Sequence, residues 1–202
     1  MGLLSTSTSV TQYQVEGQLD EPIIDNIADG LKKQTIIDID GEPSQEAAGW
    51  TSFKSPFEPR FDDHSFLIGT DFVFSLRIDK KSIPPKLVQK QVRQQAIKRQ
   101  NALKRDFLSK EEQKSIKEGV VAALNLKIPS IPSVYDLVWQ YEKGVLWFFS
   151  NLKTANEQLE RLFVKSFGLH LIRKIPYTMA AFDKTINSAE LDRLNRLSHI
   201  EN

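Results

Sequence analysis

The chain has 202 residues, of which 40% are hydrophobic and 26% charged, and its formal net charge is +1 at neutral pH. This length allows one domain or two small ones with a substantial core, and the hydrophobic content excludes a wholly disordered chain. The absence of cysteine excludes disulfides, zinc–thiolate sites and thiol catalysis.

Residues 1–79 form the acidic part of the chain, with 14 acidic and 5 basic side chains.

The first ten residues lack the basic and long apolar stretches of a secretory signal. No apolar run in the sequence approaches the roughly 20 residues that a membrane-spanning helix needs. We therefore expect a cytoplasmic protein without membrane association.

The acidic part begins with a predicted strand and helix. Side chains alternate over residues 10–16, which predicts a strand that is half-buried or lies at a sheet edge. Asp20 is a candidate cap for the helix that follows, in which isoleucine, alanine and leucine recur with helical spacing. A short strand is expected at residues 35–39.

A loop and a hairpin complete the acidic part. Residues 40–65 combine prolines, glycines and aromatic rings, which predicts an ordered loop held in place by its rings. A short apolar arm at 66–68, a Gly69–Thr70 turn and a long arm at 71–78 predict a β-hairpin, since the long arm is rich in aromatic and β-branched residues.

Residues 80–105 carry nine basic side chains and no acidic one. From Pro84 onward the pattern is helical, and prolines suit a first helical turn, where a missing N–H costs nothing. One arc of this helix is apolar, and the opposite arc carries cations. The residues expected to pack on the protein are Val88, Val92, Ala96, Leu103 and Phe107.

The absence of acids makes this stretch a candidate polyanion-binding site. An ordinary exposed helix mixes acidic and basic side chains and is stabilised by ion pairs between residues four apart. In this helix the basic side chains repel one another, and bound phosphates would relieve that repulsion. A merely solvated helix face is the alternative interpretation. The candidate DNA-binding residues are Lys80, Lys81, Lys86, Lys90, Arg93, Lys98, Lys104 and Arg105.

A second helix is expected directly after the basic one. Ser109 and Glu112 have the spacing of a capping box, and the helix should run to about Asn125. Two prolines then make residues 126–133 extended.

The last third of the chain repeats the succession of hairpin and helix. A hairpin is expected from residues 134–141 and 145–149, followed by a helix at 152–167 with Gly168 as its stop signal. A strand at 170–176 and a final amphipathic helix at 183–200 should follow.

These elements predict an α+β protein, in which two sheet-forming parts are linked by a protruding pair of helices. The expected division is an acidic α+β part at residues 1–79, the helical protrusion at 80–133, and a second hairpin and helix part at 134–202 that packs with the first.

Catalytic patterns are weak in this sequence. The dense ligand group Asp62-Asp63-His64 lies on one stretch, where neighbouring side chains point to opposite sides, and Asp38 and Asp40 lack a third ligand. No phosphate-binding glycine loop and no nucleophile elbow are present. We therefore assign no catalytic residue, metal or cofactor, and leave a metal-dependent exonuclease open as an alternative.

Several pieces of the chain, taken in order, resemble one bacterial family. They are VTQYQVEG before a helix, the pair Gly49-Trp50, the hairpin and helix GTDFVFSLRIDKKSIPPKLVQKQV, the helix LSKEEQKSIKEGVVAAL, the hairpin around Trp139, and KSFGLHLIRKIPYTMA. In this order and spacing, the chain resembles the recombination-associated RdgC family over most of its length. Family members continue with a further C-terminal portion.

The resemblance implies a protein that binds double-stranded DNA without sequence specificity, forms a homodimer, and competes with the RecA recombinase on DNA of the nucleoid. It also keeps the exonuclease alternative open, because members of this family are sometimes labelled as exonucleases. A third alternative, from the charge pattern alone, is an interaction module whose basic helix binds an acidic protein.

Overall fold

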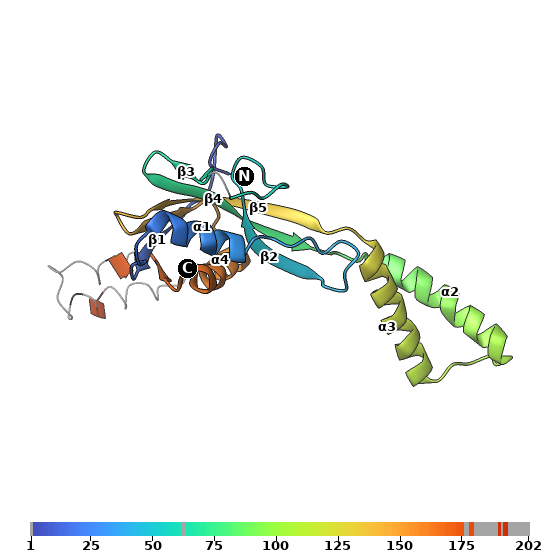
Figure 1. The fold of residues 1–202 in the computed structure, drawn as a ribbon. Coiled ribbons are helices and arrows are strands. Elements are labelled where there is room, and N and C mark those ends of the chain that lie inside the picture. The colour runs from blue at the N-terminus through green and yellow to red at the C-terminus, as the bar shows by residue number, and fades with distance from the viewer. Residues whose placement is uncertain (1, 62–63, 176–177, 180–189, 191, 194–202) are drawn as a thin grey trace. The chain divides into compact units, whose positions relative to one another are not determined.

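The computed structural model describes residues 2–61, 64–175, 178–179, 190 and 192–193 (Figure 1). In this part of the chain four helices and seven strands make an α+β fold, as predicted. The helices are α1 (Ile23–Lys33), α2 (Pro85–Leu103), α3 (Lys110–Lys127) and α4 (Lys153–Phe167). The strands are β1 (Thr11–Glu16), β2 (Glu46–Thr51), β3 (Leu67–Ile68), β4 (Asp71–Lys80), β5 (Ile131–Gln140), β6 (Val145–Phe148) and β7 (His170–Arg173).

The strands form one sheet in the order β2-β4-β5-β6-β1-β7, with β3 paired to β4. The chain groups into two compact units. Unit 1 contains the described residues of Met1–Thr35, Gly49–Arg77 and Val134–Asn202, and unit 2 contains Ile36–Ala48 and Ile78–Ser133. Strands β2, β4 and β5 each contribute residues to both units.

Both predicted hairpins are present in unit 1. Strands β3 and β4 pair antiparallel, with Leu67 opposite Phe72, and β5 pairs with β6, with Trp139 opposite Leu146. The turn of the second hairpin contains Gly144 at a φ of 61°, a left-handed conformation that glycine adopts without strain. Strand β1 lies between β6 and β7 and is antiparallel to both.

The core of unit 1 lies between the sheet and helices α1 and α4. The helical spacing of apolar residues at 152–167 predicts one buried stripe, and α4 buries all five of its members: Ala155, Leu159, Leu162, Phe163 and Phe167. The helix ends at Gly168, which takes a left-handed conformation. Burying large apolar side chains contributes about 1.5–3 kcal/mol each, so this stripe fixes the helix on the sheet.

Aromatic rings make up much of this core. The ring of Trp139 lies 4.9 Å from that of Phe163 and 5.3 Å from that of Phe167, measured between centroids. The fully buried Trp50 contacts Phe74 edge-on at 5.1 Å, and its indole N–H donates to the Ser166 hydroxyl at 2.7 Å. Trp139 and Trp50 are therefore core residues.

Two expectations for the segment around Trp50 are wrong. Residues 35–39 form no strand, and the chain makes an isolated bridge between Thr35 and Trp50 instead. The Thr35 hydroxyl donates to the carbonyl of Leu31 at 3.0 Å. This bond spans four residues, as helical hydrogen bonds do, and ties Thr35 to the end of α1 rather than to a neighbouring strand. The segment predicted as a loop at 40–65 contains strand β2. Its alanine and glycine residues have low β-propensity, which hid the strand from the sequence analysis. We attribute the extended conformation of β2 to the packing of Trp50.

The start of α1 also differs from the prediction. Asp20 does not cap it, because the cap position is Pro22 and no side chain bonds there. The backbone carbonyl of Asp20 accepts a hydrogen bond from the Asn26 amide at 2.7 Å instead. The final helix predicted at 183–200 falls largely outside the described residues.

In unit 2, α2 and α3 form a helical hairpin whose two helices contact each other and diverge toward the segment that joins them (Figure 1). The Ser109 capping box is confirmed: the Ser109 N–H donates to the Glu112 carboxylate at 2.8 Å, and the Glu112 N–H donates to the Ser109 hydroxyl at 3.2 Å. The period of its apolar residues predicts four inward side chains on α3. The helix buries two of them, Val120 and Leu124, whereas Ile116 and Val121 are only half-buried.

Candidate nucleic-acid interface

Helix α2 begins where its sequence predicts, but it ends before Phe107, the last residue of the predicted apolar arc. Pro84 is extended at the cap position and Pro85 is the first helical residue. The helix stops at Leu103, because Lys104 takes a left-handed conformation with a φ of 49°. Its apolar arc is half-buried at Val88, Val92 and Ala96, and no residue of α2 is buried.

Two residues predicted to pack do not. Leu103 is 37% exposed, and Phe107 lies beyond the helix with 86% of its surface exposed. Continuation of the apolar period past Lys104 indicated burial, but the left-handed residue turns the chain away from that arc.

Six of the eight predicted DNA-binding residues lie exposed on α2 or in the turn after it, and five of these six, all except Lys98, lie outside the groove between α2 and α3. None of the five forms an ion pair with a carboxylate in the described part of the chain. We call this set the basic face: Lys86, Lys90, Arg93, Lys104 and Arg105.

Lys81 is a correction to the predicted site. Its side chain is 6% exposed, and its ammonium donates to the backbone carbonyls of Glu42 at 2.6 Å and Asn125 at 2.9 Å. The alternation of β4 continues past its end, so Lys81 lies on the same side as the buried Asp79. An ammonium that is buried and bonded in this way is not available to a phosphate.

Lys80 and Lys98 are exposed but lie apart from the basic face. The Lys80 ammonium is 3.4 Å from the Glu46 carboxylate, so part of its charge is balanced. Lys98 lines a groove of about 720 Å³ between α2 and α3, together with Arg99, Glu111 and Glu112. The pKa of Glu112 is lowered, first by its hydrogen bond from the Ser109 backbone and further by the charges of Arg105 and Arg99.

Neutral donors on α2 escaped the sequence prediction, which counted charges alone. Gln94 and Asn101 are exposed and fall on the same arc as Lys90 and Lys104 at 100° per residue. Amide side chains are regular donors to phosphate oxygens. The signal that could have identified them is the glutamine-rich run from Gln89 to Gln100.

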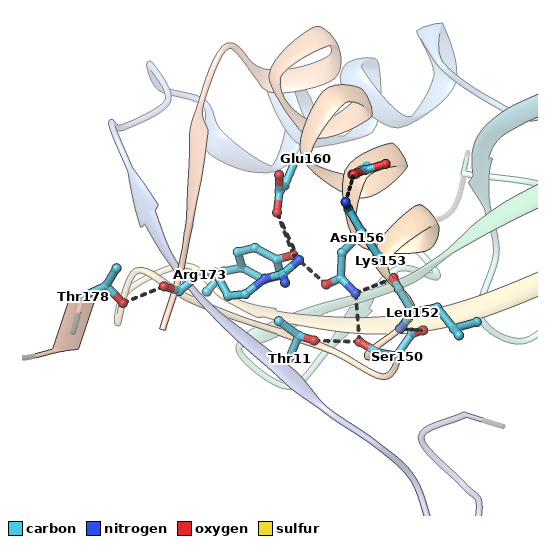
Figure 2. Close-up of polar contacts among 10 residues, drawn as sticks. Thr11, Ser150, Leu152, Lys153, Asn156, Glu160, Arg173 and Thr178 are labelled. Atoms are coloured by element: carbon cyan, nitrogen blue, oxygen red, sulfur yellow. Dashed lines mark hydrogen bonds and ion pairs between the residues drawn. The ribbon is translucent and has the colours of Figure 1, made fainter. Parts of the chain in front are cut away.

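A second polar cluster lies in unit 1, between β1, β7 and α4 (Figure 2). The buried Tyr13 hydroxyl is 2.6 Å from Asn156 Oδ1 and 3.0 Å from Glu160 Oε1, and Arg173 donates to it at 3.3 Å. Burial raises the pKa of the Tyr13 phenol well above its ordinary range. Asn156 also donates to the carbonyl of Leu152 at 2.8 Å. These groups bind one another, so the cluster joins elements of the fold rather than presenting a reactive group.

The acidic residues do not gather into a metal site in the part of the chain that the structure describes. Asp38 and Asp40 form a turn, in which the Asp40 N–H donates to the Asp38 carboxylate at 2.8 Å. The Asp40 carboxylate accepts from the N–H of Ser130 at 2.7 Å. The predicted strand that would place both on one face is absent, and Asp62 and Asp63 lie outside the described residues.

No helix among the described residues is long and apolar enough to cross a membrane. A comparison of the chain with protein-family models and with curated proteins found no match.

Proposed function

We propose that this protein binds duplex DNA without sequence specificity, through the basic face of α2. The observation that carries the proposal is the state of that helix: it buries no residue and has no acid in its first turn. Its cations form no ion pair with a carboxylate among the residues that the structure describes. The phosphates of a bound polyanion would supply the electrostatic stabilisation that carboxylates of the described chain do not give these cations.

The spacing of the cations suits a phosphate backbone. Lys86 and Lys90 are one turn apart, about 6 Å along the axis at 1.5 Å per residue, and Arg93 follows within a further turn. Duplex DNA carries one charge for about every 1.7 Å of its axis, so several cations on one helix can lie near phosphates at once. Phosphate contacts carry no sequence information by themselves.

The basic face contains no aromatic ring, which favours duplex over single strands as its ligand. Single-strand binding surfaces combine cations with rings on which bases stack. Trp50 and Trp139 are fully buried and form no such platform.

The likeness to the RdgC family extends the proposal. It supports a homodimer that coats duplex DNA of the cytoplasmic nucleoid and competes there with the RecA recombinase. Sedimentation of the protein with and without DNA tests the dimer, and RecA-driven strand exchange with added protein tests the competition.

The experiment that tests DNA binding is a salt titration with two duplexes of unrelated sequence. Equal affinities are expected, with log K falling against log salt with a slope near −5 if about six phosphates are contacted. A strong preference for one duplex, or affinity that does not change with salt, would contradict the proposal.

A further inference from the structure

The turn between α2 and α3 presents an aromatic ring to solvent. Phe107 is 86% exposed, whereas its neighbour Leu108 is 8% exposed. Burial of a phenylalanine is among the stronger stabilising contributions in a fold. Because this ring is exposed instead, it is a candidate for contact with a partner.

The turn that carries Phe107 is fixed from both helices. The Arg105 N–H donates to the carbonyl of Gln100 at 3.1 Å, and the Gln100 amide donates to the carbonyl of Asp106 at 2.8 Å. On the other side, the Gln113 amide donates to the carbonyl of Leu108 at 3.1 Å. The ring is therefore displayed on a preorganised backbone, so little loop entropy is lost when it binds a partner.

The charges around the ring indicate which partner it meets. Lys104 and Arg105 precede it and are exposed. The nearby Glu111 and Glu112 line the groove between the helices, and the Glu112 carboxylate accepts the Ser109 N–H. Asp106 is the one acid within the turn at residues 104–109. A flat apolar surface beside two cations matches a nucleobase, which has an apolar face next to a phosphate.

We infer that Phe107 stacks on unpaired bases, and that the protein thereby favours DNA in which the duplex is locally open. The cations of α2 would hold the flanking duplex, and the ring would occupy the position of a displaced neighbour in the base stack. This inference rests on the proposed function. It adds a preference for locally open duplex, which the basic face alone does not select.

The test compares a fully paired duplex with the same duplex carrying a central three-nucleotide bubble. The parent protein should bind the bubble about tenfold more tightly, since stacking of one base on an aromatic side chain has this size. The variant Phe107→Ala should bind both duplexes equally, with the affinity and salt slope of the parent on paired DNA. Phe107→Trp should keep the preference, and the fluorescence of the new indole should be quenched by the bubble.

The matched control is Ile97→Ala, which removes an exposed apolar side chain from α2 and should keep the preference. Equal binding of both duplexes by the parent would overturn the inference and leave the proposed function standing. Failure to bind either duplex would overturn both. A change in sedimentation mass caused by Phe107→Ala would show that the ring contacts a second copy of the chain, and would also overturn the inference.

Discussion

The Lys81 ammonium donates a hydrogen bond to the backbone carbonyl of Asn125 at 2.9 Å, which joins the segment after β4 to the last turns of α3. The Asn125 side chain in turn donates to the carbonyl of Pro43. One lysine of the basic stretch thus stabilises the base of the helical hairpin, while the basic face lies further along the chain.

Lys81→Met should destabilise unit 2 with little direct effect on DNA. Methionine keeps the apolar stem but leaves the carbonyls of Glu42 and Asn125 without this donor, at a cost of about 1–3 kcal/mol in the free energy of unfolding. Urea unfolding measures the change, and Lys80→Met, at an exposed position, is the control. Lower DNA affinity at unchanged stability would restore Lys81 to the binding site.

Replacing four residues of the basic face together should weaken DNA binding and keep the fold. Glutamine is nearly as good a helix former as lysine or arginine, and none of the four is buried. The salt slope should shrink by about 0.9 for each lost phosphate contact, up to about 3.6. The substitutions are Lys86→Gln, Lys90→Gln, Arg93→Gln and Lys104→Gln.

The matched control is the triple glutamine variant of Lys110, Lys114 and Lys117 on α3. Acidic residues surround these lysines, and Lys114 lies 3.9 Å from Glu118, so their loss should matter much less. Unchanged affinity and slope in the quadruple variant would show that α2 is a solvated face. The cations around Arg161 and Lys165 on α4 would then be the next candidates, since Arg173 is engaged with Glu160 at 3.5 Å.

The capping box should weaken in acid. The pKa of Glu112 is below its ordinary value of 4.5 in the fold, so its carboxylate stabilises the fold fully at neutral pH. That contribution is lost as the pH falls from about 4.5 through the lowered pKa. The melting temperature of the parent should exceed that of Glu112→Gln at pH 7, and the difference should shrink as the pH falls below about 4.5. A gap that persists in acid would contradict this account.

Tyr13 should limit stability in alkali. Its pKa is raised in the fold from an ordinary value of 10.0, so the unfolded chain ionises first and stability falls as the pH rises above about 10. The variant Tyr13→Phe removes this loss but leaves buried partners such as Asn156 without the phenol, at a cost of about 1–3 kcal/mol near neutral pH. Urea unfolding at pH 8 and pH 11 checks both effects.

Incubation with magnesium or manganese should leave labelled duplex uncut. Within the described chain no three candidate ligands gather. The Asp38 carboxylate accepts the Asp40 N–H, and the Asp40 carboxylate accepts the N–H and hydroxyl of Ser130. Gel electrophoresis of the products provides the measurement. Reproducible cutting that Asp62→Ala or Asp63→Ala abolishes would instead support the metal-dependent exonuclease.

Local signals in the sequence predicted the elements whose ends depend on local chemistry. The Ser109 capping box, the prolines at the start of α2 and the glycine after α4 act within a few residues, and the structure has all three where expected. The apolar stripe of α4 was equally readable, because a single helix face against a sheet buries every residue of its period.

The failures concern contacts that depend on distant parts of the chain. Phe107 continues the apolar period of α2 and was therefore expected to be buried, yet it is exposed. The residues around it give no signal that the helix ends at Lys104 in a left-handed conformation. Lys81 looks like its neighbours in a basic run, and its burial depends on carbonyls of Glu42 and Asn125 far along the chain. Its alternation with Asp79 was the one usable signal.

Helix α2 has a consequence for how this protein can change over generations. Because no residue of the helix is buried, substitutions at its exposed positions escape the penalties that cavities and unsatisfied buried groups impose elsewhere. Its charge can therefore rise or fall one residue at a time while the sheet and its helices stay intact. Under the proposed function, a lineage carrying this hairpin could change its affinity for DNA without first acquiring spare stability.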